Sequence, residues 1–131
     1  MGIIIEWDDD EKTILRQVYN GLWTWQEMDA MLSQAYQLIE VVGHRVDFIV
    51  DIRKSNFVPD NFVSGIGKAE RKLHPNQGVV VLVGATALID RLLKLANDLN
   101  KIQQDPGMVS SLEEARAFIA AHRPVETPAA E

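Results

Sequence analysis

The strongest constraint on the fold is a short apolar run in the second half of the chain. It reads Gly78-Val79-Val80-Val81-Leu82-Val83-Gly84, five apolar residues in succession between two glycines. A strand with one face in water alternates apolar and polar residues, whereas a strand covered on both faces is apolar throughout. The run therefore predicts a strand in a central position of a parallel sheet that is covered by helices.

The segments around this strand alternate between strand and helix patterns. An antiparallel hairpin is expected first, because two short β-branched runs flank the polar turn at residues 8–12. The later elements follow the order strand, helix, strand, with right-handed crossovers expected. The sequence therefore predicts an α/β domain with a mostly parallel, mixed sheet, helices on both faces and the order β-β-α-β-α-β-α-β-α. The remaining strands are expected at 3–7, 13–19, 46–52 and 107–109, and the helices at 24–42, from Pro59, at 86–100 and from 112.

Two of the predicted helices carry recognisable start signals. Thr24 is followed three residues later by Glu27, and Ser111 by Glu114. In such capping boxes the hydroxyl accepts from an unpaired amide of the first turn, while the carboxylate accepts from the cap residue's own amide. Gly43 stands where the first helix should end, because glycine readily adopts the left-handed conformation there.

Length and composition indicate one globular domain. The chain has 131 residues, of which 47% are hydrophobic and 24% charged. We expect residues 1–123 to form the domain and residues 124–131, a short Pro/Ala segment, to be a disordered tail.

Charge and cysteine content restrict the classes of partner. The net charge of −6 disfavours nucleic acid, since an acidic surface repels phosphates. The chain has no cysteine, so disulfides and thiol catalysis are excluded. No apolar run is long enough to cross a bilayer, and the first residues lack the features of a signal peptide. We therefore expect a cytoplasmic protein without a transmembrane segment.

The order of elements and two segments resemble the STAS superfamily, whose fold is that of the anti-sigma-factor antagonists. The segments are Asp47-Phe48-Ile49-Val50-Asp51-Ile52 and the Val79–Gly84 run. The resemblance implies a non-catalytic regulatory module that acts by binding a protein partner. Phosphorylatable members have a serine at the start of their second helix, but residues 57–62 contain no hydroxyl. We therefore expect no phosphorylation site.

A second hypothesis is a small-ligand site at the carboxyl ends of the parallel strands, where open α/β sheets bind their ligands. Basic side chains near helix N-termini would suit an anion, and an acyl or lipid ligand is the other option. An ordinary solvated loop at this edge stays open as an alternative, as do interface or helix-cap roles for Trp23 and Trp25. The candidate ligand-binding residues are Trp23, Asp51, Arg53, Lys54, Ser55, Gly84 and Thr86.

Catalysis and metal binding have little support in the sequence. The histidines at positions 44, 74 and 122 have no second ligand at metal-binding spacing. No nucleophile elbow, phosphate loop or dinucleotide motif is present. We expect no enzyme activity, no cofactor and no metal.

The first predicted strand is a candidate interface. It begins with Ile3, Ile4 and Ile5 and is expected at the sheet edge. Edge strands expose unpaired amides and carbonyls that a second chain can bind. We therefore expect a weak or moderate homodimer through this strand, with a helical face as the other candidate contact surface. An edge that is shielded within the monomer is the alternative to both.

Overall fold

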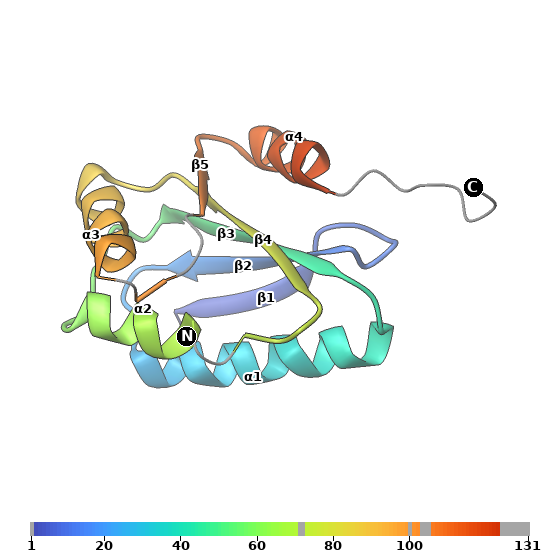
Figure 1. Ribbon diagram of the computed structural model, residues 1–131, viewed down its shortest axis with the longest axis horizontal. Coiled ribbons are helices and arrows are strands. Elements are labelled where there is room, and N and C mark those ends of the chain that lie inside the picture. The colour runs from blue at the N-terminus through green and yellow to red at the C-terminus, as the bar shows by residue number, and fades with distance from the viewer. Residues whose placement is uncertain (1, 71–72, 100, 103–105, 124–131) are drawn as a thin grey trace.

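The computed structural model describes residues 2–70, 73–99, 101–102 and 106–123 (Figure 1). The predicted tail at 124–131 lies outside them. The elements follow the predicted order. The strands are β1 (Ile3–Trp7), β2 (Ile14–Asn20), β3 (Val46–Lys54), β4 (Gln77–Val83) and β5 (Gly107–Val109), and the helices are α1 (Trp25–Val42), α2 (Phe62–Glu70), α3 (Ala87–Asp98) and α4 (Leu112–His122).

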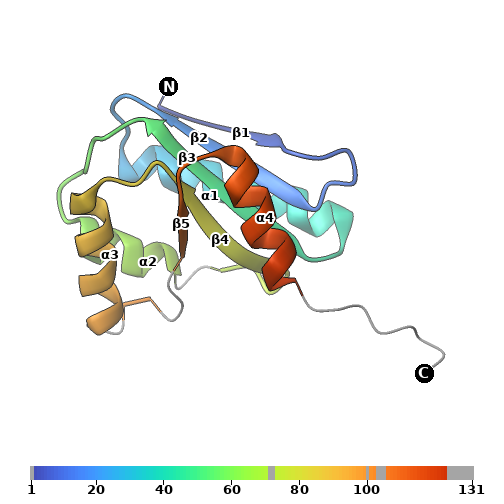
Figure 2. The ribbon, with the colours of Figure 1, turned by 90° about the horizontal axis from the view of Figure 1, so that it is seen from above.

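The five strands form one mixed sheet in sequential order, β1-β2-β3-β4-β5. β1 runs antiparallel to β2, and the other pairs are parallel. The α/β prediction is therefore confirmed. Right-handed crossovers that always step in one direction place their helices on one face of the sheet. Accordingly α1, α2 and α3 lie on one face, while α4, which follows β5, covers the other (Figures 1 and 2).

The predicted start of α1 is confirmed. The Thr24 hydroxyl accepts from the Glu27 amide at 3.1 Å, and the Glu27 carboxylate accepts from the Thr24 amide at 3.1 Å. The helix ends at Gly43, whose φ of 71° is left-handed as expected. Ser111 caps α4 by accepting from the Glu114 amide, but the Glu114 carboxylate accepts from the Ser110 amide at 3.2 Å rather than from that of Ser111, so only half of the predicted second capping box forms.

Helix α2 begins later than predicted. The sequence pointed to Pro59, but the first helical residue is Phe62. Asn61 has a φ of 59°, which lies outside the helical region, so the helix cannot extend back through it. Pro59 therefore belongs to the loop before the helix.

Trp25 joins the starts of α1 and α2. Its indole Nε1 donates to the carbonyl of Asp60 at 2.9 Å, and its ring packs against Trp23 and Phe62. A Cβ atom at Gly65 would lie 2.3 Å from the nearest Trp25 ring atom. Glycine inside this helix is thus explained by the close approach of the Trp25 ring.

The sheet separates two hydrophobic cores of different packing. On the α4 side, Val81 and Val83 of β4 are fully buried against Ala115 and Ile119. On the other side, Val80 of the same strand is only partly buried, although β4 is paired on both sides as predicted. β3, rather than β4, is the middle strand. The partial exposure of Val80 marks incomplete filling of the space between the sheet and α1–α3.

Among the described residues, no helix combines the length and the apolar character that crossing a bilayer requires.

Candidate functional site

A cavity of about 170 Å³ lies between the sheet and helices α1, α2 and α3. Its floor is the helix-facing side of β2, β3 and β4, and its roof is formed by the three helices. The floor residues are Gln17, Tyr19, Phe48, Val50, Ile52, Val80 and Leu82, and the roof residues are Met28, Leu32, Tyr36, Phe62, Ile66, Ala69, Ile89 and Leu93.

Strand register places a polar residue of β2 in the middle row of this floor. Gln17 of β2 pairs with Val50 of β3, and Val50 pairs with Leu82 of β4. The three side chains therefore form one row across the sheet, and all three line the cavity. Val50 is only partly buried even though it lies on the middle strand, because its side chain borders the cavity.

The cavity wall reaches the surface beside α2. Leu73, which follows α2, lines the cavity and is 45% exposed. Next to it, Nε2 of His74 lies 2.6 Å from a Glu40 oxygen near the end of α1. Nδ1 of His74 accepts from the Asn76 amide at 3.0 Å, so Nε2 carries the proton that is donated to Glu40. This contact connects the last turn of α1 to the segment after α2, as Trp25 connects the two helix starts.

The polar atoms of the wall are few and uncharged. The Tyr19 hydroxyl donates to Oε1 of Gln17 at 3.2 Å, and burial raises the pKa of Tyr19, so the phenol stays neutral. The Ser55 hydroxyl donates to the Gly21 carbonyl at 2.6 Å. At the start of β4, Oε1 of Gln77 is buried and has no hydrogen-bond partner among the residues that the structure describes. No Asp, Glu, Lys, Arg or His occurs among the described residues of the wall.

The structure divides the predicted strand-end residues into separate environments. Trp23 and Ser55 line the cavity. Asp51 and Arg53 instead form a two-pronged ion pair, in which Arg53 Nε and Nη2 donate to the two Asp51 oxygens at 2.9 and 2.8 Å. Hydrogen bonds from Arg53 hold the pKa of Asp51 below its ordinary value. An anion at this edge would therefore have to compete with Asp51 for the guanidinium group.

The remaining predicted ligand residues have local roles or face solvent. Gly84 has a φ of 83°, and a Cβ atom there would lie 2.7 Å from Cγ of Arg53. The Thr86 hydroxyl caps α3 by accepting from the Ile89 amide at 3.2 Å. Lys54 is exposed at the end of β3.

The candidate interface strand β1 lies at the edge of the sheet. Ile3 and Ile5 are half-buried and pack against the core between the sheet and α1–α3, whereas Ile4 is 61% exposed. β1 pairs with β2 on one side.

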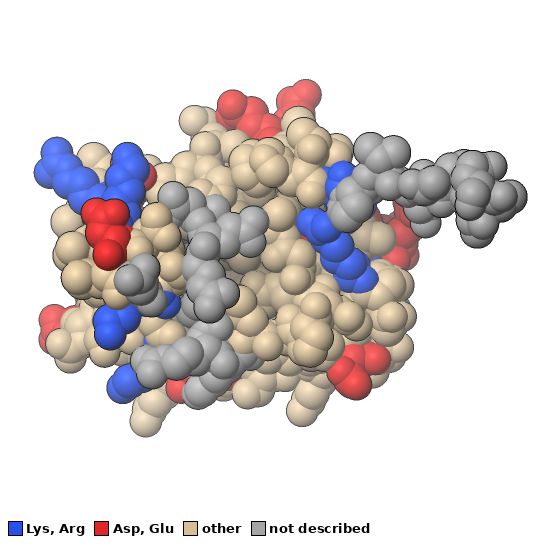
Figure 3. Space-filling view, in the orientation of Figure 1, with Lys and Arg blue, Asp and Glu red and all other residues tan. Residues whose placement is uncertain are grey.

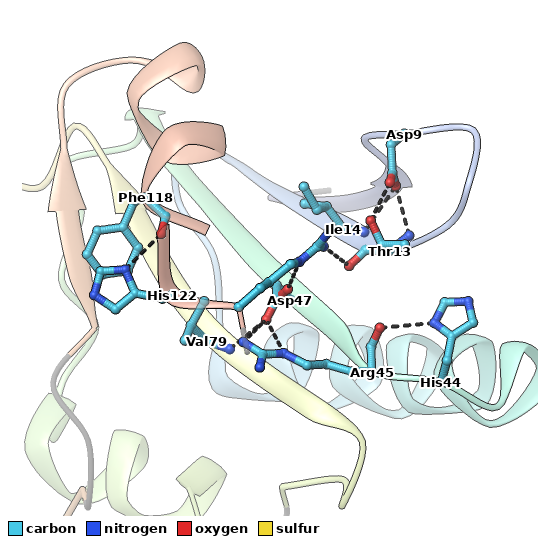
Figure 4. Close-up of polar contacts among 10 residues, drawn as sticks. Asp9, Thr13, Ile14, His44, Arg45, Asp47, Val79, Phe118 and His122 are labelled. Atoms are coloured by element: carbon cyan, nitrogen blue, oxygen red, sulfur yellow. Dashed lines mark hydrogen bonds and ion pairs between the residues drawn. The ribbon is translucent and has the colours of Figure 1, made fainter. Parts of the chain in front are cut away.

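Sequence reasoning missed a buried carboxylate on the other face (Figure 4). Asp47 has no exposed surface and accepts from Arg45 Nε at 3.0 Å, the Val79 amide at 2.8 Å and Arg123 Nε at 2.9 Å. Arg123 also donates to the carbonyl of Thr13 at 3.1 Å. The cluster ties the residue after α4 to the starts of β2, β3 and β4. Every Asp47 oxygen is used internally, so the cluster is structural.

The described residues contain no group of three or more side chains suited to hold a metal ion. His122 bonds through Nδ1 to the carbonyl of Phe118 at 2.8 Å, one turn earlier in α4.

Comparisons with known proteins place the fold. No protein-family model and no curated protein sequence matches the chain. Among solved structures, the chain is similar to the NMR structure of the protein TM1081, with a TM-score of 0.61 and 11% identity. The match covers 88% of this chain and 86% of that chain. At this identity the similarity shows a shared fold.

Proposed function

We propose that this chain is a non-catalytic domain that binds a small apolar molecule in the cavity between the sheet and α1–α3. The observation that carries the proposal is the cavity itself, since protein interiors are normally packed without large voids. A partly open, apolar cavity with few polar groups is the usual form of a small-molecule site.

The volume limits the size of the ligand. Drug-sized ligands occupy pockets of roughly 300 Å³ or more, whereas an engineered apolar cavity of about 150 Å³ holds benzene. The cavity of about 170 Å³ therefore suits a single ring or a short branched chain. A longer acyl chain would have to leave most of its length outside, beyond Leu73.

The composition of the wall supports a binding role without catalysis. General acid–base chemistry needs a side chain that exchanges protons near neutral pH, such as histidine or a perturbed carboxyl group. The described wall offers glutamines, a serine and tyrosines. The STAS-like relationship and a cytoplasmic location remain proposals of the same kind, supported by the order of elements and by the sequence features given above.

Benzene binding tests the proposed function. We expect benzene to shift the NMR signals of Trp23 and Val50, and Val50→Phe, which fills the cavity floor, to abolish the effect. Val18→Phe is the matched control, because Val18 is half-buried on the opposite face of β2. Unchanged spectra of the wild-type protein near the solubility limit of benzene, or equal binding by both variants, would refute the proposal.

A row of leucines along α3 and at its C-cap residue, Leu99, favours a second candidate function, self-association. Leu88, Leu95 and Leu99 are exposed, Leu92 is half-buried, and the four are spaced 4, 3 and 4 residues apart. This spacing is that of a coiled-coil seam. α3 lies at one end of the molecule, where a second copy can approach it (Figure 2).

The charges beside the row are complementary to those of a second copy. In an antiparallel pair of α3 helices that sets Leu92 against Leu95, Arg91 of each copy lies beside Asp98 of the other. Neither Arg91 nor Asp98 has a polar partner within the described part of the chain. We therefore assign this surface to a two-fold homodimer.

Charge reversal distinguishes this contact from one through β1. Sedimentation velocity should show a dimer that Arg91→Asp dissociates and that the double variant Arg91→Asp/Asp98→Arg restores. Ile4→Lys should leave the dimer intact. A strictly monomeric wild type, or a dimer sensitive to Ile4→Lys and indifferent to the charge reversals, would contradict the α3 contact.

A further inference from the structure

Gln17 stands out within the cavity because it is a polar side chain on an apolar sheet face. It is 3% exposed and lies between Leu15 and Tyr19 on the side of β2 that faces α1, α2 and α3. Burying an amide without its hydrogen bonds costs free energy, so such a residue is uncommon in a core. Its position in the cavity floor calls for an explanation beyond packing.

The carboxamide of Gln17 is only half used inside the protein. Its Oε1 accepts from the Tyr19 hydroxyl at 3.2 Å. A glutamine side chain also carries two N–H donors on Nε2. No hydrogen bond from Nε2 to another residue is formed in the described part of the chain. Two donors are thus available to whatever occupies the cavity.

The surroundings of Gln17 exclude an ionised partner. The described wall contains no charged side chain, and the nearby Tyr19 phenol is kept neutral by burial. The basic side chains at this end of the molecule lie on its outer surface, over α2 and α3 (Figure 3). A buried carboxylate or ammonium group would therefore have no counter-ion, at a large cost in desolvation.

Gln77, the other glutamine of the wall, is too far away to share a small ligand with Gln17. Gln77 pairs with Val46 and Gln17 pairs with Val50, so the two glutamines are separated by four residues along β3. Four residues of extended strand span about 13 Å. This distance exceeds the length of a single-ring ligand, and Gln77 therefore serves as a control position.

We propose that Gln17 recognises a neutral ligand with one hydrogen-bond acceptor, such as a cyclic or short-chain ketone, whose remaining surface is apolar. The proposal rests on the cavity-binding function proposed above and adds to it the chemical class of the ligand. The acceptor receives a hydrogen bond from Nε2, while the hydrocarbon part lies against Val50, Leu82 and the helices.

The test compares cyclohexanone with methylenecyclohexane, which has nearly the same shape but lacks the acceptor oxygen. The dissociation constants of both are measured by NMR titration of the wild type and of Gln17→Met/Tyr19→Phe. This variant removes both hydrogen-bonding partners together, which avoids leaving either one buried and unpaired. Gln77→Met is the control, and the single variant Gln17→Met replaces the double variant if the latter does not fold.

We expect the preference for the ketone, expressed as the ratio of the two dissociation constants, to fall about tenfold in the double variant and to stay unchanged in Gln77→Met. Equal ratios in all proteins, with both compounds bound, would overturn the role of Gln17 and leave the cavity-binding function intact. Cyclohexanecarboxylate bound as tightly as cyclohexanone would overturn the neutral class. Binding of neither neutral compound would overturn both proposals.

Discussion

Lengthening two adjacent valines of β4 by one methylene group should have opposite effects on stability. Val80 faces the cavity and is partly buried, whereas Val81 faces α4 and has no exposed surface. Val80→Leu places its extra methylene in unfilled space, which stabilises the fold by about 0.8 kcal/mol. Val81→Leu forces the same group into a closed core, which costs about 1 to 3 kcal/mol.

The comparison is internally controlled, because both variants make the same chemical change in the same strand. Both substitutions change the same residue type in the same strand, so what differs between them is the packing on the two faces of the sheet, on which the effect of a strand substitution depends. The free energies of unfolding should therefore differ by about 2 to 4 kcal/mol. With a slope of about 2 kcal/mol per molar urea, the unfolding midpoints should lie about 1 M or more apart.

Equilibrium unfolding in urea, followed by tryptophan fluorescence and circular dichroism, measures this difference. The midpoint of the wild type should fall between those of the two variants. Equal destabilisation by both substitutions would show that the helix-facing side of β4 is as closely packed in solution as the α4 side. That result would remove the basis of the ligand proposal.

Three further predictions test the local structure. Thr24→Ala should lower the free energy of unfolding by about 1 kcal/mol in urea melts, because α1 loses its capping acceptor. Thr24→Ser should keep most of the wild-type free energy of unfolding, because the serine hydroxyl can accept the same hydrogen bond. Gly65→Ala should separate α2 from the Trp25 ring and lower the melting temperature. The double variant Trp25→Ala/Gly65→Ala should lower the melting temperature by less than the two single variants do when their effects are added. The pKa of Asp51 is lower in the folded state than its ordinary value, mainly because of its hydrogen bonds with Arg53. The pairing therefore stabilises the fold at any pH above the ordinary carboxyl pKa. This contribution to stability is lost as the pH falls through the pKa of Asp51 in the folded state. Asp51→Asn should therefore be less stable at pH 7 and show a shallower stability decrease between about pH 5 and pH 2; parallel profiles for the two proteins would argue against this account.

Much of the fold could be predicted from local sequence because the deciding signals are local. The capping pair of Thr24 and Glu27 uses atoms three residues apart, and Gly43 ends α1 through its own backbone conformation. The run from Val79 to Val83 predicts a strand with both faces covered. The start of α2 could not be predicted in this way, because it depends on the left-handed backbone of Asn61.

The cavity could not be predicted from the sequence. The spacing of apolar residues indicates which face of a strand or helix is buried, but it does not indicate how closely that face is packed. Its depth depends on where α1 and α2 lie above the sheet, which the distant contacts of Trp25 and His74 help to set. One signal was nevertheless present in the sequence. Alternation along β2 places Gln17 on the same face as Leu15 and Tyr19, and a polar residue in that position indicates a specialised site.

The ion pair of Asp51 and Arg53 was also accessible to sequence reasoning. Residues two apart in a strand lie on the same face, so their opposite charges could have been paired before the structure was known. The cluster around Asp47 was not accessible in this way. Arg123 is 76 residues away from Asp47 in the chain, and nothing local indicates that they meet.

The sequential order of the strands has a consequence for how such a domain can evolve. Because the three crossovers place their helices on one face, α4 is the one helix of the described residues that covers the other, and the two cores lie on opposite sides of the sheet. Substitutions on the helix-rich side can therefore alter the shape and polarity of the interior while the α4 side maintains the architecture. Lineages that retain this fold should diverge in binding preference mainly at cavity-floor positions such as 17, 50 and 80, and should retain the residues packed beneath α4.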